Sequence, residues 1–321
     1  MSGAAEATFR ERIAQNRRNS LLLFVTFLVF VLAFGYIIGY AWVGDPAGAF
    51  FGLVIAFFAG GLSGLLSYYA GDKMVLAASR ARRIEHDDAP VLFNVVEEMA
   101  IAAGLPMPKV YVIDDSAPNA FATGRDPEHA SVAVTSGLLE KLDRDELQGV
   151  IAHEMSHVRN LDIRYSMLVG ILVGTTVLIA DFFLRSLWWG GGRRRNDQGN
   201  GQLQLILMII AIILAILAPI FARLLQLSIS RQREYLADAS AVELTRNPKG
   251  LADALEKIAK DQEPLEVANR ATAHLYIVNP IKRFEKHSRS LFSTHPPIEE
   301  RIRILRAMET GGVPQTGRDA G

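Results

Sequence analysis

Four long apolar stretches dominate the pattern of hydrophobic and polar positions along this chain. Residues 20–44 and 46–71 contain no charged side chain, and each exceeds the roughly 20 residues that a helix needs to cross a bilayer. The third stretch, residues 165–180, is shorter and is followed by Asp181, whereas the fourth, residues 203–222, is again uncharged. The pattern therefore predicts four transmembrane helices, arranged as two successive hairpins.

Basic residues flank the first hairpin on its outer sides and are absent from the short connection around Asp45. Four arginines lie between residues 10 and 18, and Lys73 is the first of several basic residues after the hairpin. The positive-inside rule then places the N-terminus and the region after residue 71 in the cytoplasm. The second hairpin contains three arginines at 193–195, which oppose this rule, yet we expect both of its stretches to span the membrane.

Shorter elements fill the polar regions of the chain. Asp143 followed by Glu146 has the spacing of a capping box, which predicts a helix that begins at residue 144. Residues 119–124 fit either a strand or a loop. Apolar positions at helical spacing predict further helices at 90–103, 136–142, 223–245, 249–260 and 296–308, and β-branched runs predict strands at 110–113 and 131–135.

Composition narrows the chemistry that the chain can perform. Its 34 basic residues balance 34 acidic ones, so no excess of positive charge points to a nucleic-acid partner. The chain has no cysteine, which excludes disulfides, thiol catalysis and thiolate metal ligands. Any zinc site must therefore use imidazole and carboxylate groups.

The segment His153-Glu154-Met155-Ser156-His157 has the form H-E-x-x-H and lies on a predicted helix. Four residues of helix turn through about 400°, so both imidazoles point from one face and can bind one Zn²⁺. Glu154 is offset by one residue, beside the metal, where a carboxylate can act as the general base that activates water. A chance match of this motif on an ordinary helix is the weaker interpretation.

A catalytic zinc needs a third protein ligand and keeps one position open. No third histidine follows at the spacing of the H-E-x-x-H-x-x-G-x-x-H class. Glu234 and Asp238 lie one helical turn apart, and they fit two interpretations equally well. Either Glu234 coordinates zinc while Asp238 accepts a hydrogen bond from a ligand histidine, or both are exposed and face Arg231 and Arg233.

Three further segments of the sequence, together with the H-E-M-S-H motif, carry a resemblance to a known family. They are R-Q-R-E-Y-L-A-D at 231–238, P-N-A-F-A-T-G at 118–124 and S-T-H-P-P at 293–297. With the two apolar hairpins, this combination resembles the HtpX family, the bacterial relatives of the CAAX prenyl endopeptidases. The resemblance covers nearly the whole chain. The Gly/Arg stretch near 190–201 departs from it, being unusually basic for that hairpin.

The resemblance implies a gluzincin-type endopeptidase that is embedded in the bacterial inner membrane and has its active site on the cytoplasmic side. It implies one Zn²⁺ per chain, bound by His153, His157 and Glu234, with Asp238 as the hydrogen-bond partner of a ligand histidine. Membrane proteins or unfolded polypeptides would be the substrates, in membrane-protein quality control. The sequence carries no signal of oligomeric state.

Two weaker site assignments complete the predicted site, the first from the same resemblance and the second from position in the sequence. Asn119, Ala120 and Phe121 would form an edge strand that holds substrate backbone by strand addition, or only a strand of the small sheet. His295 and Arg301 lie six residues apart across the N-terminus of the last helix, where one or both could stabilise the oxyanion of the tetrahedral intermediate. Alternatively, His295 only lies near the helix N-terminus and Arg301 is a solvated helix residue.

The expected fold is a mainly α membrane protein with a mostly helical, zincin-like catalytic domain and a small antiparallel sheet. The second hairpin splits this domain in sequence, so its metal ligands come from both sides of the hairpin. The expected segments are a cytoplasmic N-terminus (1–19), two membrane helices (20–71), the first catalytic part (72–164), the second hairpin (165–222), the second catalytic part (223–309) and a disordered tail (310–321).

Three other functions are compatible with parts of this pattern. A processing protease for one substrate class, such as prenylated peptides, would use the same site, but two N-terminal spans and a hairpin, rather than a larger barrel of helices, favour the broader endopeptidase. A membrane scaffold with a structural zinc would not require Glu154 beside the metal. Transport is disfavoured because Asp181 is the single ionisable residue among the apolar stretches.

Overall fold

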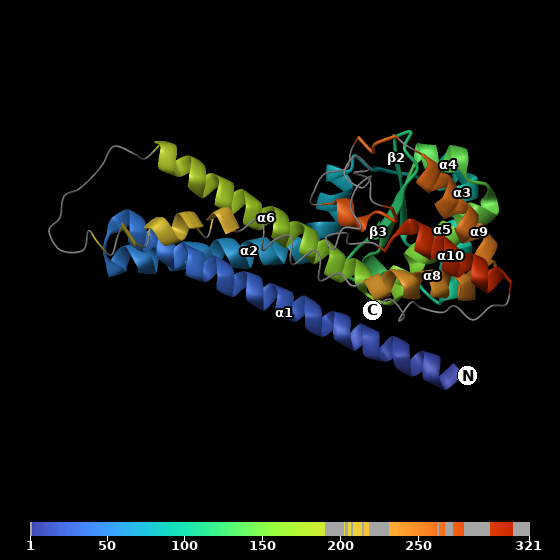
Figure 1. The fold of residues 1–321 in the computed structure, drawn as a ribbon, viewed down its shortest axis with the longest axis horizontal. Coiled ribbons are helices and arrows are strands. Elements are labelled where there is room, and N and C mark those ends of the chain that lie inside the picture. Colours follow the sequence, from blue (N-terminus) through green and yellow to red (C-terminus); the bar gives the residue numbers. More distant parts are fainter. Residues whose placement is uncertain are drawn as a thin grey trace. The chain divides into compact units, whose positions relative to one another are not determined.

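The computed structural model separates into two compact units (Figure 1). One unit contains residues 1–16, 72–167 and 229–321, and the other contains residues 17–71 and 168–228. The structure describes residues 2–189, 202, 205, 206, 208–213, 215–217, 231–261, 263–266, 272–278 and 296–310. The Gly/Arg stretch at 190–201, most of the fourth apolar stretch, His295 and the tail after residue 310 lie outside the described residues.

Two helices in the described part of the chain are long and apolar enough to cross a membrane. They lie within α1 (Ser2–Val43) and α2 (Pro46–Ala78), which confirms the first two predicted spans. The other two are not confirmed. In α6 (Asp162–Trp189) an ion pair between Asp181 and Arg185 follows the short apolar stretch. Of the fourth stretch, the structure describes the apolar helix Met208–Leu217, fewer residues than a span requires.

Glycines bring α1 and α2 into backbone contact. A Cβ added to Gly52 would lie 2.2 Å from the carbonyl oxygen of Gly35, and one added to Gly39 would lie 2.3 Å from that of Gly48. Such approaches are possible only without side chains, and they compensate for the lack of a hydrophobic driving force between helices in lipid. Gly48 and Gly52 of α2 both lie at this contact, whereas a Cβ added to Gly61 would meet no atom within 4 Å.

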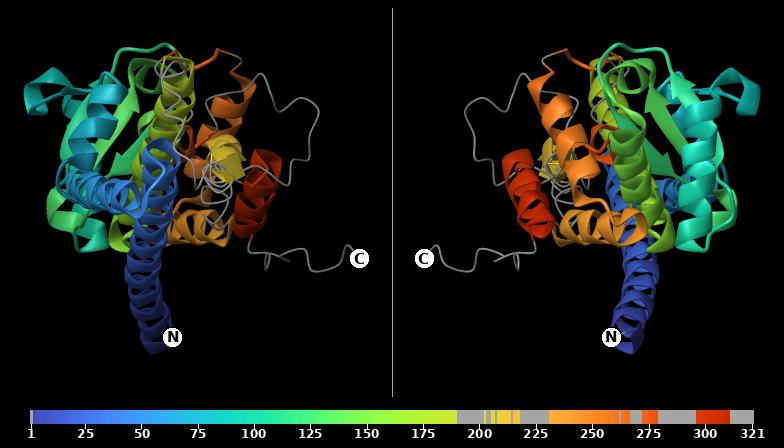
Figure 2. Two further views of the ribbon diagram at one scale, coloured as in Figure 1. Left: turned by 90° about the vertical axis from the view of Figure 1, so that its left-hand side faces the viewer. Right: turned by 90° about the vertical axis from the view of Figure 1, so that its right-hand side faces the viewer.

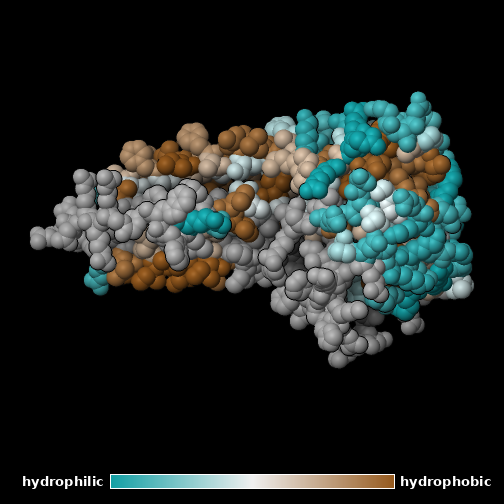
Figure 3. All heavy atoms as spheres, turned by 90° about the horizontal axis from the view of Figure 1, so that it is seen from above, coloured by the Kyte–Doolittle hydropathy of each residue, from teal (hydrophilic) through white to brown (hydrophobic). Residues whose placement is uncertain are grey.

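Large apolar side chains cover the outer surface of these two helices. Val29, Phe50, Ile55 and Phe58 are each at least 60% exposed, and brown, hydrophobic residues mark this surface in Figure 3. A contiguous apolar surface of this kind would be unfavourable in water and is stable against lipid chains. The surface therefore supports a membrane location.

A four-stranded sheet belongs to the unit that holds the H-E-x-x-H motif. Its strands are β1 (Arg82–Arg83), β2 (Lys109–Ile113), β3 (Ala120–Thr123) and β4 (Ser131–Thr135), in the order β1-β2-β4-β3. The prediction of an antiparallel sheet holds for the pairs β1–β2 and β3–β4 but is wrong for β2 and β4, which run parallel, so the sheet is mixed. After β2 the chain crosses to the far edge to form β3 and then returns antiparallel as β4 between them. Strand β3 thus occupies a sheet edge.

Helix α5 (Arg144–Arg159) is the central helix of this unit and packs against α3, α8 and α9. The other described α-helices are α3 (Pro90–Ala103), α4 (Ser136–Lys141), α8 (Arg231–Thr245), α9 (Pro248–Lys260) and α10 (Ile298–Glu309). Helices α8, α9 and α10 also pack against one another and are coloured orange to red in Figure 2. Three short 3-10 helices complete the described elements: His86–Asp88, Pro127–His129 and Ala273–Leu275.

Candidate metal centre and active site

Local sequence fixes the helix that carries the H-E-x-x-H motif. Asp143 accepts a hydrogen bond from the backbone N–H of Glu146, and the Glu146 side chain accepts one from the backbone of Asp143, so the predicted capping box is present. The apolar face of α5 is fully buried, which fixes the rotation of the helix about its axis. As a result His153 and His157 project to one side, with their Nε2 atoms 3.2 Å apart.

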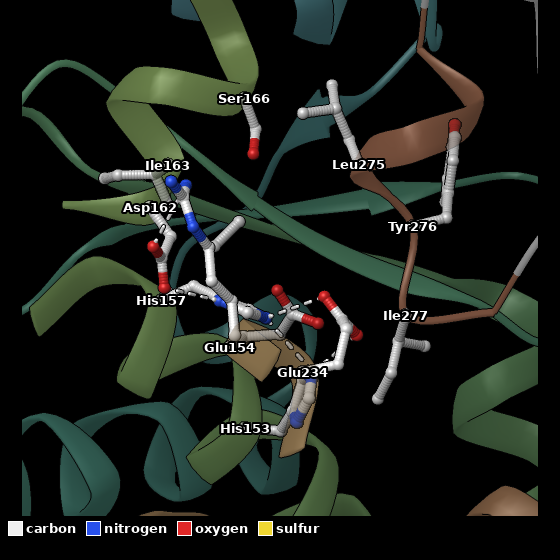
Figure 4. Close-up of a pocket in the computed structure, with 12 residues that line it drawn as sticks. His153, Glu154, His157, Asp162, Ile163, Ser166, Glu234, Leu275, Tyr276 and Ile277 are labelled. Atoms are coloured by element: carbon white, nitrogen blue, oxygen red, sulfur yellow. Dashed lines mark hydrogen bonds and ion pairs between the residues drawn. The ribbon is translucent and has the colours of Figure 1, made fainter. Parts of the chain in front are cut away.

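Glu234 of α8 completes a group of three possible metal ligands (Figure 4). Its carboxylate oxygens lie 3.8 Å from His153 Nε2 and 3.7 Å from His157 Nε2. One ligand atom from each of the three residues lies within 4.8 Å of the other two. Among the described residues, this is the one group of three or more side chains that could hold a metal ion. Of the two interpretations of this acidic pair, the structure therefore favours the first, because Glu234 and Asp238 are buried and face the histidines.

The donor set fits a zinc ion. Atoms that bind one tetrahedral zinc at 2.0–2.1 Å lie about 3.3 Å from each other, close to the separation of the two Nε2 atoms. Two imidazoles and one carboxylate are the ligands of one class of catalytic zinc site, in which the fourth position stays open. The three residues present therefore fit the metal that the sequence predicts.

Each of the two histidines that could bind a metal has a carboxylate beside its Nδ1 atom. His153 Nδ1 lies 2.9 Å from Asp238 Oδ1, and His157 Nδ1 lies 3.1 Å from Asp162 Oδ2. A proton held on Nδ1 by a carboxylate leaves the Nε2 lone pair available to a metal and fixes the ring orientation. Both rings thus present Nε2 toward Glu234.

Arg301 of α10 lies behind Asp238 rather than in the cavity. Its guanidinium is 1% exposed and donates two hydrogen bonds to Asp238, of 2.8 and 2.7 Å, and one of 2.9 Å to the carbonyl of Ile277. Its Nη1 also lies 3.6 Å from Glu234 Oε2. A bidentate pair of this kind fixes the position of the carboxylate as well as neutralising its charge.

The pKa values of the two histidines are shifted in opposite directions. Burial is the largest influence on both, and it lowers the pKa of His153 to about 4 although Asp238 opposes it. At His157 the hydrogen bond to Asp162 and the charge of Glu234 outweigh burial and raise the pKa to about 9. The carboxylates around His157 thus create a negative potential that favours a cation, whether a proton or a metal ion.

Glu154 lies next to the three possible ligands on the same helix, and it is almost fully buried. Burial raises the pKa of its carboxyl to about 7, although the charge of His157 and a backbone hydrogen bond from Ala122 oppose the shift. A carboxyl group with a pKa near neutrality can both accept and return a proton, which is the property that a general base and acid requires.

A small cavity opens beside these groups and can be followed in Figure 4. Its wall contains Ala122 of β3, the start of α6, and residues 275–277. Ile163, Leu275 and Ile277 provide apolar surface, while the Tyr276 hydroxyl points away from the ligands toward Ser79.

The predicted edge segment lies next to this cavity but does not line it. The carbonyl of Ala120 accepts a hydrogen bond of 2.9 Å from the backbone N–H of Ile277, and the side-chain amide of Asn119 donates one of 3.0 Å to the carbonyl of Val278. The ring of Phe121 packs edge to face on Tyr276. Residues 277 and 278 thus already lie along this part of the strand.

Sequence reasoning missed two residues of the site, Asp162 and Arg233. Asp162 follows the motif helix by only three residues, and an acidic residue just past such a helix is a signal that could have been used. Arg233 lines the cavity, lies 3.4 Å from Asp162 and stacks over the ring of Tyr165. It is adjacent in sequence to Glu234, so its place follows from that of α8.

Comparisons with known proteins identify the family of the chain. The sequence profile of peptidase family M48 matches residues 86–309. A protease HtpX homolog of Streptococcus uberis is 47% identical over 299 residues, which cover 93% of this chain and 99% of the relative. One of Caldanaerobacter subterraneus is also 47% identical, over 302 residues that cover 94% of this chain and 98% of the relative.

Among solved structures, the crystal structure of S. mikatae Ste24p matches with a TM-score of 0.45 and 21% sequence identity. The match covers 88% of this chain and 66% of that chain. The family assignment rests on the sequence matches, which extend over most of the chain and over nearly the whole length of the relatives. The chain belongs to the HtpX group of peptidase family M48 and is a metalloprotease.

Proposed function

We propose that this protein is a membrane-embedded zinc endopeptidase that cleaves membrane proteins or unfolded polypeptides from the cytoplasmic side of a bacterial inner membrane, in membrane-protein quality control. One Zn²⁺ per chain would be held by His153, His157 and Glu234. The observation that carries the proposal is the convergence of these three side chains beside a buried Glu154. The basic residues that flank the first hairpin, and their absence from its connection, support the cytoplasmic orientation.

The chemistry follows from the positions of these side chains. Zinc, when bound, acts as a Lewis acid that polarises the scissile carbonyl and makes water more acidic. Glu154 accepts the proton of the attacking water and passes it to the leaving amine, for which a pKa of about 7 is suited. Asp238 and Asp162 hold the ligand imidazoles in one tautomer and one orientation.

Arg301 supports the site as a positioning residue in this proposal, because its hydrogen bonds go to Asp238 and Ile277. His295, which lies outside the described residues, is then the candidate for the oxyanion stabiliser. Strand β3 would hold substrate backbone near Ala122, because this residue lines the cavity whereas Ala120 already accepts the N–H of Ile277.

The activity can be tested with full-length protein purified in detergent, stripped with a chelator and then given zinc. Cleavage of an unfolded model polypeptide should return with zinc in the parent and fall by at least about 100-fold in Glu154→Gln, which removes the base. Glu97→Gln makes the same chemical change at an exposed position of α3 and should cut like the parent. Stoichiometric zinc in the parent without any cleavage would contradict the endopeptidase proposal and favour a structural zinc.

Orientation and substrate class need separate assays. Inverted inner-membrane vesicles should cut a polypeptide added from outside, whereas sealed right-side-out vesicles should not, if the site faces the cytoplasm. Cleavage only in right-side-out vesicles would contradict the proposed orientation. Cleavage of a prenylated peptide, with no cleavage of unfolded polypeptides, would favour the narrower processing function.

A further inference from the structure

A buried asparagine near the N-terminus contacts the end of the helix that carries the H-E-x-x-H motif. Asn16 lies on α1 at the start of the candidate span Ala14–Ala41 and is 4% exposed. Its side-chain amide donates one hydrogen bond of 2.8 Å to the carbonyl of Asn160 and another of 2.8 Å to Asp162 Oδ1. A buried amide is costly unless it is hydrogen-bonded, so this pair of contacts fixes the position of Asn16 against two residues of the unit to which it belongs.

Both partners of Asn16 lie where the motif helix ends. Asn160 is the C-cap residue of α5, and its carbonyl is one of the last carbonyls of the helix, which have no partner within it. The next residue, Leu161, has a φ of 58°, a left-handed conformation that a branched side chain rarely adopts. This turn places Asp162 beside His157, and the amide of Asn16 bonds to the residues on either side of it.

Asp162 uses its two carboxylate oxygens for different partners. Oδ2 lies 3.1 Å from His157 Nδ1, whereas Oδ1 lies 2.8 Å from the amide of Asn16 and 3.4 Å from Arg233 Nη1. Donors on Oδ1 restrict rotation of the carboxylate and keep Oδ2 turned toward the imidazole. A continuous path of hydrogen bonds therefore runs from Asn16 through Asp162 to His157.

We propose that Asn16 is a positioning residue for the metal centre, and that it completes this centre by holding Asp162 against His157. The inference rests on the proposed role of His157 as a zinc ligand. Residues that orient ligand histidines typically change metal affinity by 10–100-fold when they are replaced. The affinity of the site for zinc then depends on a residue that lies 141 positions before His157 in the sequence.

The test measures zinc affinity of the full-length protein in detergent by competition with a chromophoric chelator. Asn16→Ala should weaken zinc binding by about 10-fold, and Asn16→Ser, which keeps one donor, by less. Gln15→Ala changes the adjacent, exposed residue and should bind zinc like the parent. In the Asp162→Ala background, Asn16→Ala should add no further loss, because residues that act through one contact are not additive.

The outcomes separate this inference from the proposed function. If the parent binds one zinc and Asn16→Ala binds it with unchanged affinity, the inference fails while the proposed function stands. If Asn16→Ala weakens binding by the same factor with or without Asp162, the effect does not pass through Asp162 and the inference fails too. A parent that binds no zinc, at any chelator concentration, overturns both.

Discussion

Replacing Arg301 by methionine tests the claim that this residue supports the metal site from behind. The change removes two charge-assisted hydrogen bonds to Asp238 and the bond to the carbonyl of Ile277, and it leaves Asp238 buried with His153 as its remaining partner. Methionine retains much of the side-chain volume, so the loss is mainly electrostatic. We therefore expect the result of breaking a buried ion pair rather than of opening a cavity.

The size of the effect follows from the burial of both partners, Arg301 and Asp238. Removing one member of a buried ion pair costs about 3–5 kcal/mol. At roughly 2–4 °C per kcal/mol for a domain of 150–250 residues, the Tm should fall by about 6–20 °C. Circular dichroism of the protein in detergent measures the shift.

Arg303 provides the matched control, because it lies on the same helix and pairs with Glu300 at the surface. An exposed pair contributes at most about 1 kcal/mol, so Arg303→Met should change the Tm by about 4 °C or less. Combining Arg301→Met with Asp238→Asn should cost less than the sum of the single changes, since the two residues are in direct contact. An Arg301→Met variant with the Tm of the Arg303→Met control would refute the reasoning.

Two further predictions concern other parts of the molecule. Gly52→Ala should lower the Tm, because the added methyl group forces α1 and α2 apart at a cost of about 1–3 kcal/mol. Gly61→Ala is the control: its methyl group meets no atom within 4 Å, so the Tm should stay unchanged or rise. Equal effects of the two changes would argue against the glycine contact. Burial raises the pKa of Asp253, but hydrogen bonds from Lys249 and Arg306 outweigh it and hold that pKa below its usual value. The stabilisation by Asp253 is therefore present above the ordinary pKa of the group and is lost as the pH falls through the pKa of the folded state. In urea unfolding, Asp253→Asn should have a lower free energy of unfolding than the parent at pH 7 and the same free energy in strong acid. A difference that persists in acid would contradict this assignment.

Local signals in the sequence predicted the helix that presents the histidines. The capping box at Asp143 and Glu146 starts α5 in the structure as predicted, and Gly104 ends α3 in the left-handed conformation that favours glycine. The H-E-x-x-H spacing then requires that His153 and His157 project from one face. These features depend on residues at most four apart, which is why the sequence alone reveals them.

Features that depend on distant residues were predicted less well. The pattern of apolar residues along a strand does not reveal which strands lie beside it. The crossing that makes β2 and β4 parallel therefore left no local signal in the sequence. Glu234 was assigned from resemblance, since its spacing from Asp238 fits an exposed pair equally well. The bond from Asn16 to Asp162 joins residues 146 positions apart, and no short pattern encodes it.

The membrane part shows a different limit. Apolar stretches of 25 or more residues, as in α1 and α2, identify spans by length alone, whereas a stretch of 16 residues followed by Asp181 does not. The structure describes only a short apolar helix, Met208–Leu217, within the fourth stretch. Whether a short stretch spans depends on its packing against other helices, which hydropathy does not contain.

The most direct test of the central claim is X-ray absorption spectroscopy of zinc in the purified full-length protein and its variants. We predict one zinc per chain with two imidazole ligands and one carboxylate at about 2.0–2.1 Å, unchanged in Glu154→Gln and altered or lost in Glu234→Ala. The same zinc environment in Glu234→Ala as in the parent would contradict the assignment of Glu234 as the third ligand. Zinc bound without imidazole would contradict the site as a whole.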